Sequence, residues 1–347
     1  MATKRILTGM RPTGALHLGH YVGALKQWLA LQDEYECFFL IADVQALTTH
    51  VDRPRVIEES VREVVLDWLG VGLDPTKPNV CFVLQSSLPE LTELTAYFTM
   101  LVPFTKMEHN PTIRAELKDL KKSATAGFMI YPISQAADIL LFSPYPPEKS
   151  DKLLVPVGED QVPHLEETNQ IARRFNALYG KTFLECKPEV GEIGRLPGVD
   201  GKSKMSKSLG NAIQLKDGPD TVSKLVSKMF TDPKKLHRDD PGHPQRCPVY
   251  LYHRAFSTSQ MFRGRATKCK TGRLGCVECK KELADILNNF LEPIRTRRAE
   301  AEKAPLDTYL RQGTEKAREI GQNMMKVIRH AMHLDYPSVK SSLTKGG

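Results

Sequence analysis

Apolar residues in the first two-thirds of the chain gather in short runs separated by helical patterns. Four runs have the length and near-continuous apolar character of buried strands: residues 4–9, 37–44, 79–87 and 152–158. Segments with helical spacing of apolar positions follow them, at residues 18–33, 55–69, 88–100 and 159–179. This alternation is typical of a parallel, doubly wound α/β sheet, in which ligands bind where strands end and helices begin.

The pattern changes after about Lys216, where helices and loops replace the alternation. We expect helices over residues 222–230 and 280–298, and one or two more within 306–333. The chain therefore divides into an α/β part, residues 1–216, and a helical part, residues 217–340. Residues 335–347, rich in Ser, Lys and Gly, are expected to fray.

The composition is that of an ordinary globular protein, with 41% hydrophobic and 26% charged residues among 347. The longest apolar run, residues 37–42, is far too short to cross a membrane. The N-terminal residues contain no apolar export segment, which favours a cytoplasmic protein.

Positive charge is concentrated in one region of the chain. The net charge of +8 indicates a polyanionic partner, although many basic proteins bind no nucleic acid. Between residues 264 and 281 a single acid, Glu278, is outnumbered by basic residues: Arg265, Lys268, Lys270, Arg273, Lys280 and Lys281.

Four of the seven cysteines lie in or near this basic, loop-rich region. Cys247, Cys269, Cys276 and Cys279 have the spacing C-x21-C-x6-C-x2-C. Four thiolates that end in C-x2-C can hold zinc or an iron–sulfur cluster, and the alternative is a chance grouping of free thiols. Without an export segment, a disulfide framework is not expected.

Residues 8–28, TGMRPTGALHLGHYVGALKQW, lie where the first strand should turn into a helix. Gly9 would let the chain turn sharply, and Gly19 would let a base or a phosphate approach the backbone. A helix N-terminus favours phosphate, and His17 and His20, on one side of its first turn, can both donate to an anion. The alternative is a pair of surface histidines in an ordinary loop.

Residues 201–211, GKSKMSKSLGN, form a second candidate site rich in Gly, Ser and Lys. Such a loop can fold its lysines onto a polyphosphate and withdraw afterwards. The alternative is a solvated basic loop, but the pentapeptide Lys204–Ser208 downstream of His-Leu-Gly-His in one α/β chain argues against it.

Together the two motifs resemble the signatures of class I aminoacyl-tRNA synthetases, as HLGH at residues 17–20 and KMSKS at 204–208. Three longer stretches, GMRPTGALHLGHYVGAL, YPISQAADILL and LVPVGEDQVPHLEETNQIARRFN, are similar to bacterial tryptophanyl-tRNA synthetases. The resemblance covers residues 4 to about 334. It implies a Rossmann-type catalytic domain in residues 1–216, a helical anticodon-binding domain in residues 217–340, and a homodimer.

The resemblance also implies the residues of the active site. Catalysis would depend on His17, His20, Lys204 and Lys207. ATP, with its Mg²⁺, would contact Arg11, Pro12, Thr13, Gly19, His20, Gly158, Glu159, Asp160, Leu196, Lys204, Met205, Ser206, Lys207 and Ser208. The tryptophan carboxylate would attack the α-phosphorus of ATP, and the ribose hydroxyl at the end of tRNA(Trp) would then accept the tryptophanyl group.

The amino-acid pocket implied by the resemblance contains Gly9, Tyr131, Gln135, Asp138 and Gln161. Asp138 would accept the indole N–H of L-tryptophan, and an apolar pocket with one such acceptor rejects phenylalanine. The alternative for Asp138 is an exposed helix acid or an N-cap.

Three residues depart from the commonest bacterial pattern. Arg11 replaces Gln, Gln135 replaces Met, and Gln45 replaces His, as in a divergent branch of the family. Some tryptophanyl-tRNA synthetases carry a [4Fe–4S] cluster on similarly spaced cysteines, so the resemblance favours that cluster over Zn²⁺. A tyrosyl-tRNA synthetase and a regulatory paralogue that binds tryptophan or ATP are the alternative functions.

Overall fold

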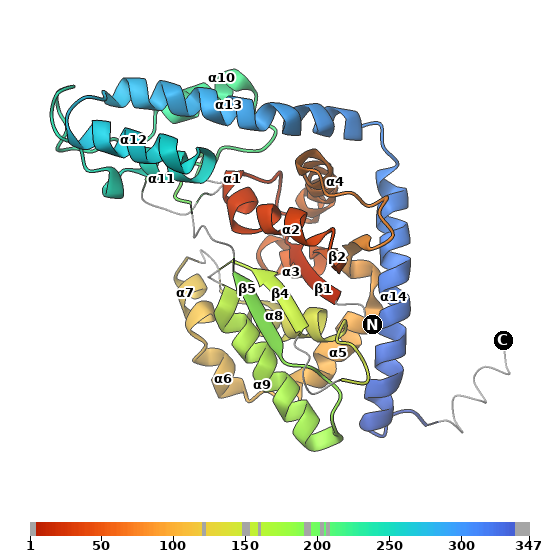
Figure 1. Cartoon of the computed structure of the whole chain (residues 1–347). Coiled ribbons are helices and arrows are strands. Elements are labelled where there is room, and N and C mark those ends of the chain that lie inside the picture. The colour runs from red at the N-terminus through yellow and green to blue at the C-terminus, as the bar shows by residue number, and fades with distance from the viewer. Residues whose placement is uncertain are drawn as a thin grey trace.

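The computed structural model describes residues 5–119, 123–147, 153–158, 161–190, 196–201, 205 and 209–336. A sheet of five parallel strands, in the order β3-β2-β1-β4-β5, forms its centre (Figure 1). The strands are β1 (Arg5–Met10), β2 (Glu36–Ile41), β3 (Val80–Leu84), β4 (Leu153–Val157) and β5 (Cys186–Val190). The doubly wound parallel sheet expected from the sequence is confirmed.

Helices cover both faces of the sheet, and further helices lie to one side of it. In chain order they are α1 (Leu18–His20), α2 (Lys26–Leu31), α3 (Asp43–His50), α4 (Pro54–Val71), α5 (Pro89–Thr99), α6 (Phe104–Glu108), α7 (Pro111–Asp119), α8 (Ala126–Leu140), α9 (Val162–Tyr179), α10 (Pro219–Ser227), α11 (Pro248–Phe256), α12 (Ser259–Lys270), α13 (Cys276–Ala301) and α14 (Leu306–Ala331). In the described part of the chain, no helix has the length and apolar character needed to cross a bilayer.

Successive side chains of each strand point to opposite faces of the sheet, so the core has two halves. Ile6, Cys37 and Phe39 pack on one face of the sheet with residues of α2, α4 and α13. Their neighbours Leu7 and Phe38 pack on the other face with residues of α5, α8, α9 and α14. Because both faces are covered, the strands are apolar at successive positions, which is why they are recognisable in the sequence.

Three segments differ from the expected elements. Residues 259–270 form the helix α12, where a loop was expected, and Cys186–Val190 forms an edge strand that the sequence did not predict. The first helix runs from Leu18 to Leu31 but contains a π-helical turn at Tyr21–Leu25. Polar residues are frequent in α12 and β5 because both elements are largely exposed, so neither has an apolar pattern.

The helix α14 closes the open edge of the sheet at β3. The hydroxyl of Thr314 accepts the backbone N–H of Leu84, with Oγ1 and N 3.0 Å apart. Gly313 approaches the strand so closely that a Cβ atom there would lie 2.2 Å from the carbonyl oxygen of Phe82. Capping an edge strand in this way hides backbone groups that would otherwise pair with another chain.

The contact between α14 and β3 makes Gly313 sensitive to substitution. In Gly313→Ala the added methyl group would meet backbone atoms, so α14 must move away from β3. We expect the free energy of unfolding to fall by about 1–3 kcal/mol, measured by denaturant unfolding. The matched control is Gly264→Ala in α12, where a Cβ meets nothing within 4 Å and alanine favours the helix. An equal loss in both variants would contradict this account.

Candidate active site

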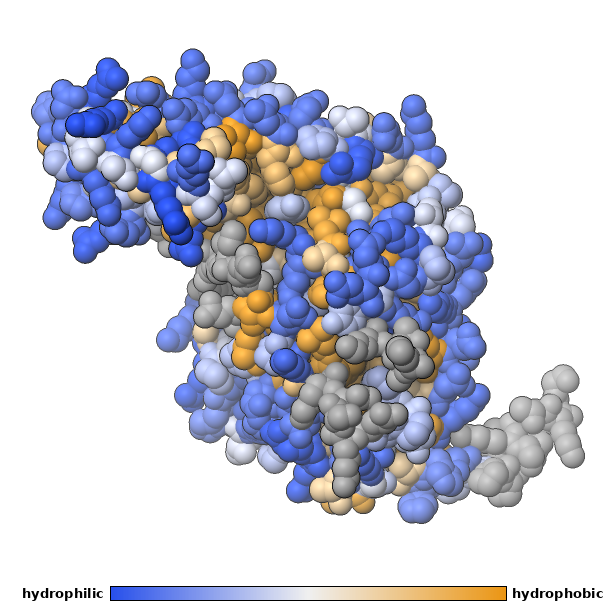
Figure 2. Space-filling model, viewed as in Figure 1, coloured by the Kyte–Doolittle hydropathy of each residue, from blue (hydrophilic) through white to orange (hydrophobic). Residues whose placement is uncertain are grey.

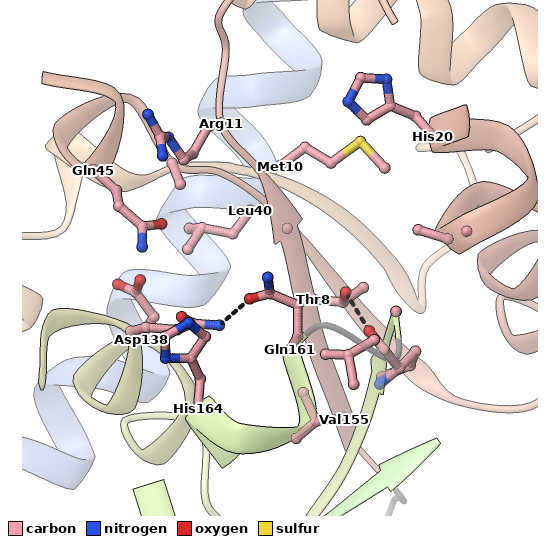
Figure 3. Close-up of a pocket in the computed structure, with 18 of the residues that line it drawn as sticks. Thr8, Met10, Arg11, His20, Leu40, Gln45, Asp138, Val155, Gln161 and His164 are labelled. Atoms are coloured by element: carbon pink, nitrogen blue, oxygen red, sulfur yellow. Dashed lines mark hydrogen bonds between the residues drawn. The ribbon is translucent and has the colours of Figure 1, made fainter. Parts of the chain in front are cut away.

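A cavity of about 790 Å³ opens at the carboxyl ends of β1 and β4. These strands flank the point at which the strand order reverses, where helices on the two faces diverge and leave room for a ligand. The cavity is lined by residues from the loop after β1, from α8, and from the segment between β4 and α9. Figure 3 shows Gln45, Asp138 and His164 toward one side of this cavity and His20 toward the other.

Most of the residues expected in the site line this one cavity. They are Gly9, Arg11, Thr13, His17, Gly19, His20, Tyr131, Gln135, Asp138, Gly158, Gln161, Leu196 and Met205. Pro12 is not among the lining residues. Glu159, Asp160, Lys204, Ser206, Lys207 and Ser208 lie outside the described residues.

The loop before the first helix holds the two histidines close together. Gly14 has a φ of 114°, a conformation that favours glycine. The backbone N–H of His17 donates to Nδ1 of His20 at 3.1 Å, and the two rings lie 3.8 Å apart. Because Nδ1 accepts this bond, the neutral His20 ring carries its proton on Nε2. His17 is almost fully buried, yet both histidines line the cavity, and their donation to an anion stays a prediction.

Gly19 and Gly9 are explained by close packing. A Cβ atom on Gly19 would lie 2.9 Å from the His17 ring and 3.3 Å from Sδ of Met205. A Cβ on Gly9 would lie 2.5 Å from the carbonyl oxygen of Leu40. Gly9 belongs to β1 itself, so the sharp turn expected there is wrong. Gly19 allows HLGH and Met205 of KMSKS to approach each other beside the cavity.

Asp138 is the buried acceptor at one end of the cavity. It belongs to α8, which Thr125 caps by accepting the backbone N–H of Phe128. The side-chain amide of Gln85 donates to Oδ1 and Oδ2 of Asp138 at 2.8 and 3.0 Å. Gln85 is itself fixed, because its Oε1 accepts the backbone N–H of Gln45 at 3.1 Å. The carboxylate therefore has one defined orientation.

Burial makes the charge on Asp138 costly. Removal from water raises the pKa of Asp138 to about 7, with Asp43 adding to the rise and the amide of Gln85 opposing it. An ionised carboxylate in a buried place binds an N–H donor strongly, because the bond is charge-assisted and burial weakens the competition from solvent.

A second set of polar groups faces the middle of the cavity. Gln135 donates to Oε1 of Gln161 at 3.2 Å, and the Tyr131 hydroxyl lies 3.2 Å from Nε2 of His164. Burial raises the pKa of Tyr131, and the neighbouring carboxylate of Glu116 adds to the rise. Burial lowers the pKa of Arg11, opposed by Glu116 and Tyr131.

Four residues of this site were not anticipated from the sequence. His50, Glu116 and His164 line the cavity, and Gln85 orients Asp138. The position of Gln85, directly after a buried strand, was the only local signal available for it. The other three come from helices and become neighbours only through the fold.

Comparisons with known proteins identify the family of the chain. The family model described as "tRNA synthetases class I (W and Y)" matches residues 2–292. The chain is 45% identical to the tryptophan–tRNA ligase of Clostridium longisporum, covering 97% of this chain and 98% of that protein. It is 44% identical to that of Thermotoga maritima strain MSB8, covering 95% and 99%. The chain belongs to the tryptophanyl-tRNA synthetases of class I.

A solved structure supports the same assignment. The tryptophanyl-tRNA synthetase of Campylobacter jejuni, described as complexed with ADP and tryptophan, superposes with a TM-score of 0.79. The two sequences are 30% identical, and the match covers 95% of this chain and 100% of that one. The fold and the aminoacyl-tRNA ligase class expected from the sequence are therefore confirmed.

The four clustered cysteines of this synthetase lie in one neighbourhood around α11, α12 and α13. Burial raises the pKa of the Cys279 thiol to about 12, and Cys247 and Cys269 add to the rise. Cys276 likewise raises the pKa values of Cys247 and Cys269. None of the four forms a disulfide. Among the residues that the structure describes, no group of three or more His, Cys, Asp or Glu side chains is arranged to hold a metal ion.

The buried charge of Asp138 predicts a pH-dependent stability. The folded-state pKa of about 7 lies above the ordinary value of 3.8, so Asp138 destabilises the fold increasingly as pH rises from 4 through 7. Asp138→Asn removes this dependence. We compare the free energy of unfolding of the variant with that of the parent. We expect this difference to change in favour of the variant by on the order of 2 kcal/mol between pH 5 and pH 8, measured by denaturant unfolding without ligand. A difference that is the same at both pH values would contradict the assignment.

Proposed function

We propose that this cavity activates L-tryptophan with ATP and then charges tRNA(Trp). The observation that carries the proposal is the buried, oriented carboxylate of Asp138 in the same cavity as His20 and Met205. One end of the cavity thus offers an acceptor for an indole N–H, and the other carries the signature motif of adenylate formation.

Adenylate formation needs no side-chain nucleophile. The tryptophan carboxylate attacks the α-phosphorus of ATP, which enters with its Mg²⁺, and pyrophosphate leaves. Protein groups hold the reactants in line and stabilise negative charge on the leaving oxygens. His20, through Nε2, and the helix N-terminus beside Gly19 are suited to this role. We assign the same role to His17, Lys204 and Lys207 on the strength of the motifs.

The remaining cavity residues suit the two substrates. Gly158 at the end of β4 and Arg11 and Thr13 after β1 line the region assigned to ATP, with Leu196 expected near the base. Tyr131, Gln135 and Gln161 line the same cavity as Asp138 and are suited to orient the amino and carboxylate groups of tryptophan.

Amino-acid-dependent pyrophosphate exchange tests this assignment. We expect activity with tryptophan, little with tyrosine, and discrimination against phenylalanine by a factor of about 10⁴, because phenylalanine has no N–H to donate to the buried carboxylate of Asp138. Asp138→Ala should cost about 1.5–3 kcal/mol in kcat/KM for tryptophan. Asp285→Ala, an exposed acid on α13, is the matched control.

Each alternative function predicts a different result. Exchange with tyrosine would identify a tyrosyl-tRNA synthetase. Exchange without charging of tRNA(Trp) would identify a regulatory paralogue. Wild-type kcat/KM in Asp138→Ala would show that the amino acid binds elsewhere.

We infer that the helical part, residues 217–340, binds the anticodon end of the tRNA, and that residues 1–216 form the catalytic domain. The helices α10 to α13 extend to one side of the sheet, and their surface is mainly hydrophilic (Figures 1 and 2). Lys268, Lys270 and Arg273 are exposed there, and Arg265 is held by Glu282 at 2.6 Å. Contacts between these cations and phosphates would give salt-dependent binding.

We also propose that the enzyme is a homodimer. Val44, Leu47 and Val51 of α3 and the turn after it are exposed by 41%, 39% and 65%. They line a second, mainly apolar cavity of about 360 Å³ that shares Gln45 and Tyr131 with the active site. Apolar side chains gathered in this way are typical of a protein interface.

We propose that Cys247, Cys269, Cys276 and Cys279 bind a [4Fe–4S] cluster, with Zn²⁺ as the alternative. The four thiolates would hold such a cluster, whose role here would be structural. The backbone N–H of Tyr250 donates to the carbonyl oxygen of Cys247 at 3.1 Å, and Gly242 leaves room for Sγ of Cys269. The donors therefore suit the cluster in kind and number. When bound, it would hold the ends of α11, α12 and α13 together.

The cysteine assignment predicts two results that can be separated. Protein prepared without air should be brown, with about four irons per chain. Cys276→Ser should weaken charging of tRNA while tryptophan-dependent pyrophosphate exchange stays largely intact, because these thiols do not line the catalytic cavity. Cys186→Ser, a buried cysteine away from the cluster, is the control. Colourless protein with one zinc would overturn the iron assignment, and metal-free protein would overturn both.

A further inference from the structure

A buried carboxylate on α4 holds the loop that leads into the signature histidines. Asp67 is fully buried, and its Oδ2 accepts the backbone N–H of Leu16 at 2.5 Å. The carbonyl oxygen of Leu16 accepts the N–H of Leu215 at 2.9 Å, and the N–H of Leu18 donates to Ile213 at 2.9 Å. The peptide before His17 is therefore fixed by α4 on one side and, on the other, by the segment that follows KMSKS.

The same carboxylate is bound by an arginine from the helical part of the chain. Nη1 of Arg298, on α13, lies 3.1 Å from Oδ1 of Asp67, and Nη2 lies 2.9 Å from Oε2 of Glu63. Lys216 joins Glu63 at 2.7 Å, close to the paired segment. Two contacts thus lead from α13 to the backbone next to His17.

Close packing fixes the position of α13 on α4 at this point. A Cβ atom on Gly70 would lie 3.1 Å from the carbonyl oxygen of Ile294 and 3.2 Å from Cβ of Arg298. Nε of Arg297 donates to the carbonyl oxygen of Gly70 at 2.7 Å. The two helices touch through backbone atoms, so a movement of α13 displaces Arg298 relative to Asp67.

Stability alone does not account for these charges. A buried ion pair contributes little net stability, and apolar residues of the same volume often replace it without loss. Burial raises the pKa of Asp67 to about 6, and Arg298 opposes this rise. Without Arg298 the carboxylate would be an unpaired buried charge. Its geometry, with one oxygen on a backbone N–H and the other on Arg298, points to a positional role.

We propose that Asp67 and Arg298 are positioning residues for amino-acid activation, which set the place of the HLGH loop according to the position of α13. The idea rests on the proposed function, since it assigns His17 and His20 to adenylate formation. The helix that begins at Cys276 and Cys279 also carries Arg298, so the region assigned to tRNA is linked to the catalytic loop by one continuous helix.

Pyrophosphate-exchange kinetics of Arg298→Met and Asp67→Leu test this role. We expect kcat to fall at least about tenfold in each, with KM for tryptophan within twofold of the parent, because Asp138 and Tyr131 contact neither residue. The double variant Asp67→Asn/Arg298→Met should recover part of the kcat lost in Arg298→Met. An uncharged amide oxygen can still accept the N–H of Leu16 without a buried charge.

The control is Arg329→Met, which breaks another ion pair between a C-terminal helix and the catalytic part. Nε of Arg329, on α14, donates to Oε1 of Glu93, on α5, at 2.7 Å, away from the HLGH loop. We expect kcat within twofold of the parent there. Unchanged kcat in Arg298→Met, or an equal loss in Arg329→Met, would overturn the proposal. Absence of exchange in the parent would instead overturn the proposed function.

Discussion

The reversal of strand order between β1 and β4 is the constraint on which the site depends. Crossovers leaving β1 and β4 go to opposite faces of the sheet, so no helix can cover the carboxyl ends of both strands. In the crevice that results, the loop after β1, the helix α8 and the start of α9 face a common cavity. Apolar strands buried on both faces keep this crevice in place.

Two buried carboxylates, one associated with each half of the core, give the site its chemistry and its shape. Asp138 is oriented by an amide and leaves an acceptor for a ligand, whereas Asp67 is directed at a backbone N–H. Burial favours the neutral form of both carboxyl groups, because it raises the pKa of each. Each carboxylate accepts a hydrogen bond from a specific donor, and substitution of the carboxylate would leave that donor without its partner. The specificity for the ligand and the geometry of the HLGH loop therefore both depend on a buried carboxylate with a fixed hydrogen-bond partner.

The sequence predicted the sheet because a buried sheet depends on local patterns, whereas most of the cavity lining was implied by the resemblance to tryptophanyl-tRNA synthetases. Apolar runs identify buried strands, and the HLGH and KMSKS motifs identify turns that must lie near the carboxyl ends of strands. Gln85, Glu116 and His164 were missed because their roles arise from neighbours distant in sequence. Gly9 was misread because its small size is required by Leu40 on the adjacent strand, which no local pattern indicates. Exposed elements such as α12 and β5 carry too few apolar residues to be recognised.

The helix α14 makes the order of synthesis matter for the catalytic sheet. It ends at Ala331, yet it covers the edge strand β3, which is completed at Leu84. Almost the whole chain must leave the ribosome before the backbone groups of β3 meet Thr314 and Gly313. Until then the growing polypeptide has an uncapped, apolar strand edge, which is the kind of edge that can pair with another chain.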